Sequence, residues 1–305
     1  MNNDELHANN KNHIKNSPLG GIGGASIVFL GSGNLATHLS LALKAAGEDI
    51  IQIFSRTQEH AQALADKLHC DSCVSISDIR TDADVYIFSV KDDALPSLIK
   101  QLSEHLANHQ HPISPSGAGG ATHHPILLHT AGSVPMSVFP DNTLTPNTHH
   151  PSPNYGVLYP MQTFSKDRNV KFREIPCFVE ACDNDTLEEI KGIASKVSDH
   201  VLEMSSEKRR KLHLAAVFAC NLVNHCYRLA EKVLEEEGID FSLYLPLIQE
   251  TANKVKELSP RQAQTGPMVR YDKKIMDAQI ALINDERTRQ IYRLMADSIH
   301  EDSSK

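Results

Sequence analysis

The sequence predicts an α/β fold, a doubly wound and mostly parallel sheet followed by an all-helical C-terminal domain. Between residues 26 and 204, short apolar runs alternate with segments of helical apolar spacing. This alternation is typical of parallel strands joined by right-handed helical crossovers. From Ser206 onward the apolar spacing is helical only. We therefore expect a first domain over residues 25–204 and a helical domain over residues 205–305.

The strands and helices of the first domain can be placed in order. The expected strands are apolar runs bounded by polar or turn residues, and they cover Ser26–Leu30, Asp49–Ser55, Cys73–Ser75, Asp84–Val90, Pro125–Thr130, Gly156–Met161, Ile175–Ala181 and His200–Met204. The expected helices carry apolar residues three and four positions apart, and they cover Asn34–Ala46, Gln58–Leu68, the stub Ser77–Arg80, Asp92–Leu106 and Thr186–Val197. Gly47 ends the first helix, because glycine readily adopts the left-handed conformation that closes helices.

Length and charge restrict the class of protein. With 305 residues, the chain is long enough for each of its domains to bury a core. Its formal net charge of -8 argues against a nucleic-acid-binding protein, which would carry a basic face. No apolar run approaches the ~20 residues that span a bilayer, so we expect no membrane span.

Some segments are expected to lack a core of their own. Residues 1–24 are rich in Asn, His, Lys and Gly without an apolar stretch, so we interpret them as a disordered tail and not as a secretory signal. Residues 109–124 and 140–153 have the composition of surface insertions. We expect a cytoplasmic protein whose six cysteines are reduced. Cys70 and Cys73 form a C-x-x-C pair without a second pair, so we predict no metal site.

A glycine-rich turn follows the first strand and opens the first helix. The turn and helix start consist of Gly31, Ser32, Gly33, Asn34, Leu35 and Ala36, which match the G-x-G-x-x-G/A pattern in the context that it requires. Gly31 permits the tight turn, Gly33 lets a diphosphate approach the backbone, and Ala36 permits close packing of helix on strand. The free amides at the helix start favour a phosphate. The turn predicts a Rossmann-type dinucleotide site, and a turn without a ligand is the alternative.

The end of the second strand indicates which dinucleotide binds. An NAD site usually carries Asp or Glu here, which accepts hydrogen bonds from the ribose hydroxyls. This chain has Ser55, Arg56 and Thr57 instead. A guanidinium and hydroxyls suit a 2′-phosphate, so we predict NADP(H), bound by Ser55 and Arg56. A solvated surface arginine is the alternative.

Two further loops leave strands at the carboxyl edge of the predicted sheet. They contain Ser89, Val90 and Lys91 after the fourth strand, and Thr130, Ala131 and Gly132 after the fifth. Ligands of such sheets bind at this edge, so we expect both backbones to border the nicotinamide half of the cofactor. Ordinary strand-to-helix loops are the alternative.

The expected helix Arg209–Leu229 is apolar with one polar stripe. At roughly 100° per residue, Asn221 lies about 80° from His213 on this stripe. Polar groups on a buried helix must find partners or line a cavity. We predict that His213 gives or takes the proton that accompanies hydride transfer, and that Asn221 holds a substrate oxygen. A satisfied hydrogen-bond network between helices is the alternative.

A polar loop interrupts the helical domain. It covers Ser259–Tyr271 and contains Thr265, followed by a Gly-Pro pair that fixes the backbone. We predict that Thr265 helps to orient the substrate, and a plain helix connector is the alternative.

These motifs together resemble the pyrroline-5-carboxylate reductase and deazaflavin-dependent NADP reductase superfamily. The chain after its tail is more similar to an uncharacterised bacterial family that pairs a Rossmann-like NADP-binding domain with a helical domain of unknown function. The segments that carry this resemblance are His129–Ser133, Tyr159–Phe164, His213–Asn221 and Ala263–Pro267 with Arg270 and Asp272. The resemblance implies an NADP-dependent oxidoreductase that dimerises through its helical domain, and it names no substrate.

We therefore expect an NADP(H)-dependent oxidoreductase that acts on a small carbonyl or imine substrate and forms a homodimer. The alternative is a non-catalytic NADP sensor that acts through its helical dimerisation domain. Such a sensor would not need His213 and Asn221 to face the nicotinamide. A methyltransferase is disfavoured, because Arg56 would meet no 2′-phosphate in that chemistry.

Overall fold

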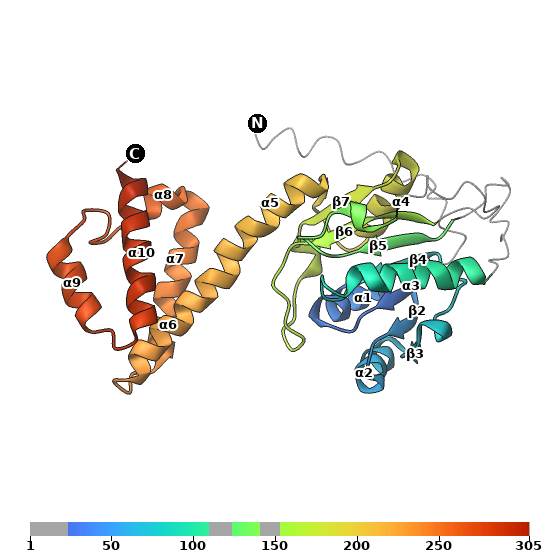
Figure 1. Ribbon diagram of the computed structural model, residues 1–305, viewed down its shortest axis with the longest axis horizontal. Coiled ribbons are helices and arrows are strands. Elements are labelled where there is room, and N and C mark those ends of the chain that lie inside the picture. Colours follow the sequence, from blue (N-terminus) through green and yellow to red (C-terminus); the bar gives the residue numbers. More distant parts are fainter. Residues whose placement is uncertain (1–23, 110–123, 141–152, 305) are drawn as a thin grey trace. The chain divides into compact units, whose positions relative to one another are not determined.

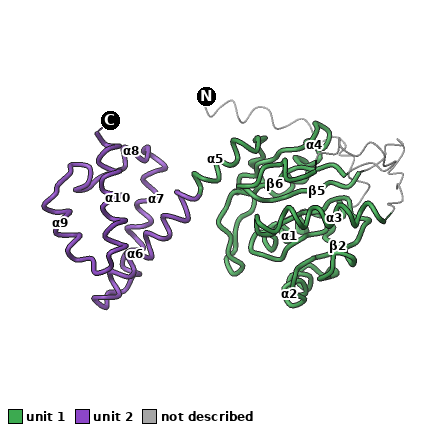
Figure 2. The backbone as a smooth tube through the Cα atoms, in the orientation of Figure 1, with its two compact units in different colours: residues 1–216 green, residues 217–305 purple. Residues whose placement is uncertain are grey.

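The computed structural model describes residues 24–109, 124–140 and 153–304 (Figure 1). The chain divides into two compact units, residues 1–216 and 217–305 (Figure 2). In this division α5 (Ser206–Ala216) belongs to the first unit. The boundary predicted from the sequence, near Ser205, instead placed these residues in the helical domain. Apart from their end residues, the predicted tail and both predicted insertions lie outside the described residues.

The described residues of the first unit form an eight-stranded sheet in the order β3-β2-β1-β4-β5-β6-β7-β8 (Figure 1). The strands are β1 (Ser26–Leu30), β2 (Asp49–Phe54), β3 (Asp71–Cys73), β4 (Val85–Phe88), β5 (Ile126–His129), β6 (Asn154–Pro160), β7 (Cys177–Ala181) and β8 (Val201–Glu203). Neighbours pair in parallel except β6 and β7, which are antiparallel. The predicted α/β fold with a mostly parallel sheet is confirmed. The third strand begins two residues earlier than predicted, at Asp71 and not at Cys73.

Helices cover both faces of this sheet. They are α1 (Asn34–Ala45), α2 (Gln58–Leu68), α3 (Leu95–Asn108), α4 (Asn184–Ser195) and α5, with short 3₁₀ turns at Ile76–Asp78, Met136–Val138 and Phe172–Glu174. Along β1, Ile27 and Phe29 pack into a core with α1, α2 and α4, whereas Val28 and Leu30 pack into a second core with α3. Both faces of the strand are therefore apolar, as a parallel sheet with two helical layers requires.

The parallel register fixes which ends of the strands share an edge. Ile126 of β5 pairs with Asn154 of β6 at the amino ends of both strands. Leu30 of β1 pairs with Phe88 of β4 at the carboxyl ends. The loops that follow these parallel strands consequently all leave the sheet at its carboxyl edge, which is the side where the strands end. They are the loops after β1, β2, β4, β5 and β6.

Helices are the only regular secondary structure among the described residues of the second unit, as predicted. Its helices are α6 (Val223–Glu235), α7 (Leu245–Glu257), α8 (Pro260–Ala263), α9 (Lys273–Ala281) and α10 (Glu286–Ser303), with a 3₁₀ turn at Phe241–Tyr244. A π-helical segment, Val217–Leu222, stands between α5 and α6 in the chain. Across the described ranges, no helix is both long enough and apolar enough to cross a membrane.

Candidate functional site

The turn after β1 accepts only glycine at its first position. Gly31 has φ +119°, a conformation that side-chain-bearing residues rarely adopt. Its amide donates to the carbonyl of Phe54 at 2.8 Å, and the Ser89 amide donates to the Leu30 carbonyl at 2.8 Å. A Cβ atom on Gly31 would lie 2.1 Å from the Ser89 carbonyl oxygen. The turn is thus clamped between β2 and β4.

The second glycine leaves an open approach to the start of α1. Gly33 is the N-cap of α1 with an ordinary φ of -75°, and a Cβ atom there would meet nothing within 4 Å. No side chain of the described residues caps this helix, and its first turn carries no acidic residue. The first amides of the helix, from Asn34 to Ala36, therefore keep their donor capacity for an anion. Ala36 is fully buried against the core, as the close packing of helix on strand requires. These residues fit a dinucleotide diphosphate.

The end of β2 brings two hydroxyls together beside a cation. Ser32 Oγ in the turn donates to Ser55 Oγ at 2.9 Å. Arg56 is exposed, and its guanidinium meets no acceptor among the described residues. The combination leaves donors for a phosphate at the place where the sequence predicts one.

The loops after β4 and β5 contribute mainly backbone. Val90 and Ala131 pack partly buried against the core that includes α3. The Thr130 hydroxyl is buried and donates to the Phe88 carbonyl at 3.2 Å, so the structure uses this side chain internally. Lys91 is exposed. The expectation that these backbones border the nicotinamide half of the cofactor stays a prediction.

His213 lies against the loop after β5. Its Nδ1 lies 3.0 Å from the Tyr159 hydroxyl, with the rings edge to face at 5.9 Å between centroids. Gly132 packs closely on both rings, since a Cβ atom there would lie 2.6 Å from His213 Nδ1 and 2.7 Å from Tyr159 Cζ. Three segments that carry the family resemblance thus meet at the carboxyl edge of β5 and β6. Sequence reasoning gave Tyr159 no role, although it placed this residue in one of those segments.

A buried ion pair holds the first turn of α5 on β7 and so restrains the position of His213, which follows one turn later. Arg209 is fully buried, and its Nη1 donates to Glu180 Oε2 at 2.5 Å. The Ser206 amide and hydroxyl also donate to the Glu180 carboxylate, at 2.9 Å and 2.6 Å. Arg209 Nη2 donates to the Val134 carbonyl at 2.8 Å. His213 follows Arg209 by one helical turn, so this anchor on β7 sets its position.

A second histidine at this edge is buried and uncharged. His129 is fully buried at the end of β5, and its Nδ1 accepts a hydrogen bond from the Ala131 amide at 3.2 Å. Burial, followed by the nearby charge of Arg209, lowers the pKa of His129 to about 3, against a small opposing effect of the Pro135 carbonyl. Its Nε2 has no hydrogen-bond partner within the described part of the chain. The imidazole is therefore neutral at physiological pH.

The loop between β6 and β7 rests on α1. Asn34 Nδ2 donates to the Phe164 carbonyl at 2.8 Å, and His38 Nε2 lies 2.9 Å from the Ser165 carbonyl. The rings of His38 and Phe164 stack at 5.4 Å, and Phe164 stacks on Phe172 at 6.1 Å. This loop therefore lies beside the start of α1, and sequence reasoning did not find this arrangement.

Asn221 and Thr265 belong to the helical unit, and both are exposed there. Asn221 lies in the π-helical segment, which holds more residues per turn than an α-helix. The predicted offset of about 80° between Asn221 and His213, drawn for an α-helix, is therefore wrong. Gln262, near Thr265, has a structural use, because it forms a capping box with Ser259 at the start of α8. The predicted roles of Asn221 and Thr265 remain predictions.

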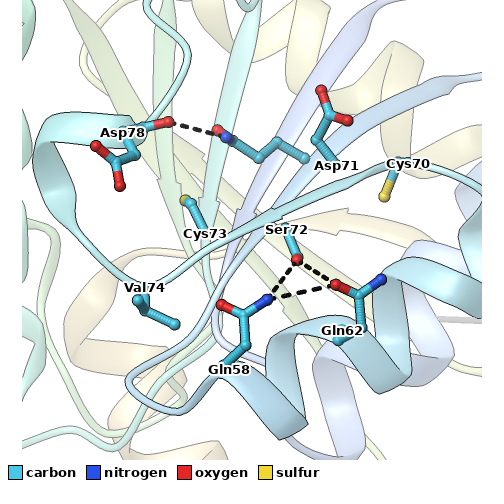
Figure 3. A pocket seen from close by; sticks show the side chains of 9 residues that line it. Gln58, Gln62, Cys70, Asp71, Ser72, Cys73, Val74 and Asp78 are labelled. Carbon is cyan, nitrogen blue, oxygen red and sulfur yellow. Dashed lines mark hydrogen bonds between the residues drawn. The ribbon is translucent and has the colours of Figure 1, made fainter.

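A shallow depression of about 550 Å³ lies elsewhere, at the β3 edge of the sheet (Figure 3). Its lining comes from β2, α2, β3 and the turn after β3, and Figure 3 shows Gln58, Gln62 and Ser72 bonded to one another on one side. Burial raises the pKa of Cys70 and Cys73, which also line it, to about 11. Both thiols therefore stay protonated at neutral pH. The predicted cofactor residues are absent from this lining.

Comparison with known proteins assigns both parts of the chain. Residues 26–116 match the family model described as NADP oxidoreductase coenzyme F420-dependent, and residues 175–299 match a domain of unknown function, DUF2520. A Bacteroides fragilis protein of known structure, named a "putative NADP oxidoreductase", is 40% identical over 91% of this chain and 98% of its own, with a TM-score of 0.78. The chain belongs to this oxidoreductase family. The predicted family, with a Rossmann domain followed by a helical domain, is confirmed.

Two more distant structures share the fold. An imine reductase from Streptomyces aurantiacus is 11% identical with a TM-score of 0.58, covering 92% of this chain and 94% of its own. A pyrroline-5-carboxylate reductase from Coxiella burnetii is 16% identical with a TM-score of 0.51, covering 92% of this chain and 97% of its own. A comparison with curated proteins gives no match. The family thus indicates a nicotinamide dinucleotide cofactor and leaves the substrate open.

Proposed function

We propose that this protein is an NADP(H)-dependent oxidoreductase for a small carbonyl or imine compound, with His213 as its proton donor or acceptor. The observation that carries the proposal is the position of His213. It lies against Gly132 and Tyr159 at the carboxyl ends of β5 and β6, and the glycine turn after β1 leaves the sheet at the same edge.

The cofactor would bind along this carboxyl edge of the sheet. The amides at the start of α1 would hold the diphosphate, while Ser32, Ser55 and Arg56 would hold the 2′-phosphate. The backbones of Ser89–Lys91 and Thr130–Gly132 would border the nicotinamide. Bound NADPH supplies the hydride that such a reduction needs.

His213 has the second task, which is to move a proton. Its Nδ1 is engaged by Tyr159, whereas its Nε2 makes no hydrogen bond to the described residues. Nε2 is therefore the nitrogen available to a substrate oxygen or nitrogen, which gains a proton when the hydride adds. We keep Asn221 and Thr265 as proposed orienting groups for that substrate.

The cofactor is tested by titrating NADPH and NADH into the wild-type protein and an Arg56→Ala variant. We expect NADPH to bind wild type at least tenfold more tightly than NADH, and the substitution to abolish most of that preference, because only NADPH carries the 2′-phosphate. Equal affinities of the wild-type protein for both dinucleotides would contradict the choice of NADP(H).

The reaction is tested with a panel of small ketones, aldehydes and cyclic imines under NADPH. His213→Ala should lower turnover by 10²-fold or more, because general acid catalysis contributes about 10²- to 10⁴-fold. Unchanged turnover would remove His213 from the chemistry. NADPH binding without turnover of any panel member would instead favour the sensor.

We also propose that the helical unit forms a homodimer. Among its described residues, the buried hydrophobic side chains are only Leu234, Met276 and Ala296. Large apolar side chains such as Phe218, Leu243, Leu282 and Leu294 are more than half exposed, and a second copy would cover part of them. Sedimentation equilibrium at micromolar concentration should give twice the chain mass of 33.7 kDa, and a monomer at every concentration would contradict the proposal.

We also propose a cytoplasmic location for the protein. All six cysteines are free thiols in the structure, as a reducing cytoplasm would keep them.

A further inference from the structure

We propose that Tyr159 is a positioning residue for His213: its hydroxyl holds Nδ1 and so fixes Nε2 as the nitrogen that carries the exchangeable proton. The inference rests on the proposed function for its consequence in catalysis. Its structural content, the tautomer of one imidazole, can be measured without any substrate.

The first support is the contact itself. The Tyr159 hydroxyl and His213 Nδ1 are 3.0 Å apart, within normal hydrogen-bonding range. A phenolic O–H group can donate a hydrogen bond to an imidazole nitrogen. A neutral imidazole that accepts the phenolic proton at Nδ1 must carry its own proton at Nε2. We assign the phenol as the donor in the neutral state, and with this assignment the contact selects the Nε2–H tautomer.

The second support is that neither ring can easily leave the contact. Tyr159 is 8% exposed, and its ring is seated in an apolar cluster with Val157 and Phe178. Leu212, the neighbour of His213 in α5, packs against the same cluster. The backbone of Gly132 closes the remaining side, at a distance that leaves no space for a Cβ atom. Packing therefore fixes the positions of the two rings, and the Tyr159 hydroxyl determines which nitrogen of His213 carries the proton.

The third support is the anchor of α5. The buried Arg209–Glu180 pair and the hydrogen bonds of Ser206 hold the first turn of the helix on β7. This turn stands one helical turn before His213, so it restrains the imidazole through the backbone of α5, separately from the contact with Tyr159. Two independent restraints converge on one side chain, as preorganised proton donors require.

A hydroxyl suits this task because it both donates and accepts. When the imidazole is neutral, the phenol donates to Nδ1. When it is an imidazolium, Nδ1–H donates to the phenolic oxygen instead. Nε2 therefore presents an N–H group in both states. When the imidazolium gives this proton to a substrate, the neutral imidazole keeps its remaining proton on Nδ1, bonded to the phenolic oxygen, and proton exchange with water restores the Nε2–H tautomer. A phenylalanine would retain the packing and lose this control.

The test is nitrogen NMR of the full-length, ¹⁵N-labelled protein at a pH where the imidazole is neutral. A His213→Gln variant identifies the His213 signals by their absence. In the wild-type protein we expect Nδ1 to resonate as a bare, hydrogen-bonded nitrogen and Nε2 as a protonated one. In Tyr159→Phe we expect both signals to move toward the averaged positions of a freely exchanging imidazole. Tyr155→Phe, the same change on the same strand, should leave them in place.

The outcomes separate this inference from the proposed function. A wild-type spectrum with the proton on Nδ1, or one that Tyr159→Phe does not change, overturns the inference whether or not NADPH binds. If Tyr159→Phe fails to fold, the wild-type tautomer alone decides. Once a substrate is known, Tyr159→Phe should lower kcat about tenfold or more while KM and the NADPH affinity stay within twofold. Failure of NADPH to bind the wild-type protein would refute the proposed function and leave the tautomer result standing.

Discussion

The two glycines of the turn after β1 should respond in opposite ways to the same substitution. Gly31→Ala places a methyl group 2.1 Å from the Ser89 carbonyl oxygen and 2.8 Å from the Ser89 carbonyl carbon. An ordinary contact needs more than 3 Å, so β1 and β4 would have to separate locally. The Leu30–Ser89 hydrogen bond spans this gap and would be lost or stretched.

The magnitude follows from the separate contributions. Backbone strain at φ +119° costs about 1–3 kcal/mol, forced overpacking about 1–3 kcal/mol, and a lost backbone hydrogen bond about 1 kcal/mol. Together they remove about 5 kcal/mol from a domain whose total stability is of the order of 5–15 kcal/mol. We expect Gly31→Ala to unfold at much lower urea concentration or to accumulate unfolded.

Gly33→Ala provides the matched control. A methyl group there meets nothing within 4 Å and φ is -75°, so the free energy of unfolding should change by less than about 1 kcal/mol. The same methyl group would block the approach of a diphosphate to the helix start, so NADPH affinity should fall tenfold or more.

The assays are urea unfolding followed by circular dichroism and titration followed by the fluorescence of NADPH. The chain has no tryptophan, which leaves the cofactor emission free of that background. A Gly31→Ala variant as stable as wild type would refute the packing argument. A Gly33→Ala variant with unchanged NADPH affinity would refute the placement of the diphosphate.

Other perturbations give further predictions. Burial lowers the pKa of His129 to about 3, against 6.5 in the unfolded chain, so as pH falls the unfolded state binds the proton first and the folded state loses stability below pH 6.5. Urea titrations should therefore show that the free energy of unfolding falls by about 2 kcal/mol between pH 7 and pH 5. The variant His129→Asn should lack this pH-dependent loss. Glu180→Gln leaves the buried Arg209 without its counter-charge and should lower the free energy of unfolding by about 3 kcal/mol. Glu207→Gln removes one partner of an exposed ion pair and should lower it by less than about 0.5 kcal/mol. Equal effects of the two substitutions would contradict the role of Glu180 as the anchor of α5. Burial also raises the pKa of the Cys177 thiol to about 11, so iodoacetamide at pH 8 should spare it until the protein unfolds, as mass spectrometry of the peptides can show.

The glycine turn and the start of α1 could be predicted because their signals are local. The spacing of Gly31, Gly33 and Ala36 specifies a turn, a helix start and a packing contact within six residues, and the structure places each as expected. Alternation of apolar runs was also sufficient for the order of strands and helices along the chain. Thr130 shows the limit of this reasoning, since only the structure reveals that its hydroxyl bonds internally.

The contact between Tyr159 and His213 could not be predicted, because it joins distant segments of the chain. Tyr159 and His213 are 54 residues apart, and they meet only because β6 pairs with β5 and Glu180 anchors α5. No local pattern encodes that meeting. The π-helical segment was equally inaccessible, since apolar spacing was interpreted with a fixed angle per residue that this segment does not obey.

The parallel register also has a practical consequence for protein engineering. The chain enters β5 at Ile126 and β6 at Asn154, on the edge of the sheet opposite to the glycine turn. Residues 109–124 and 140–153, the segments that differ most in composition from the rest, lead into those two strand starts. Fluorophores, affinity tags or surface tethers joined to the chain beside Ile126 or Asn154 would enter at the far edge from Gly31 and His213. A reporter joined at these strand starts would leave the edge that carries the glycine turn unaltered, and a sensor for cellular NADPH could be built in this way on the proposed cofactor site.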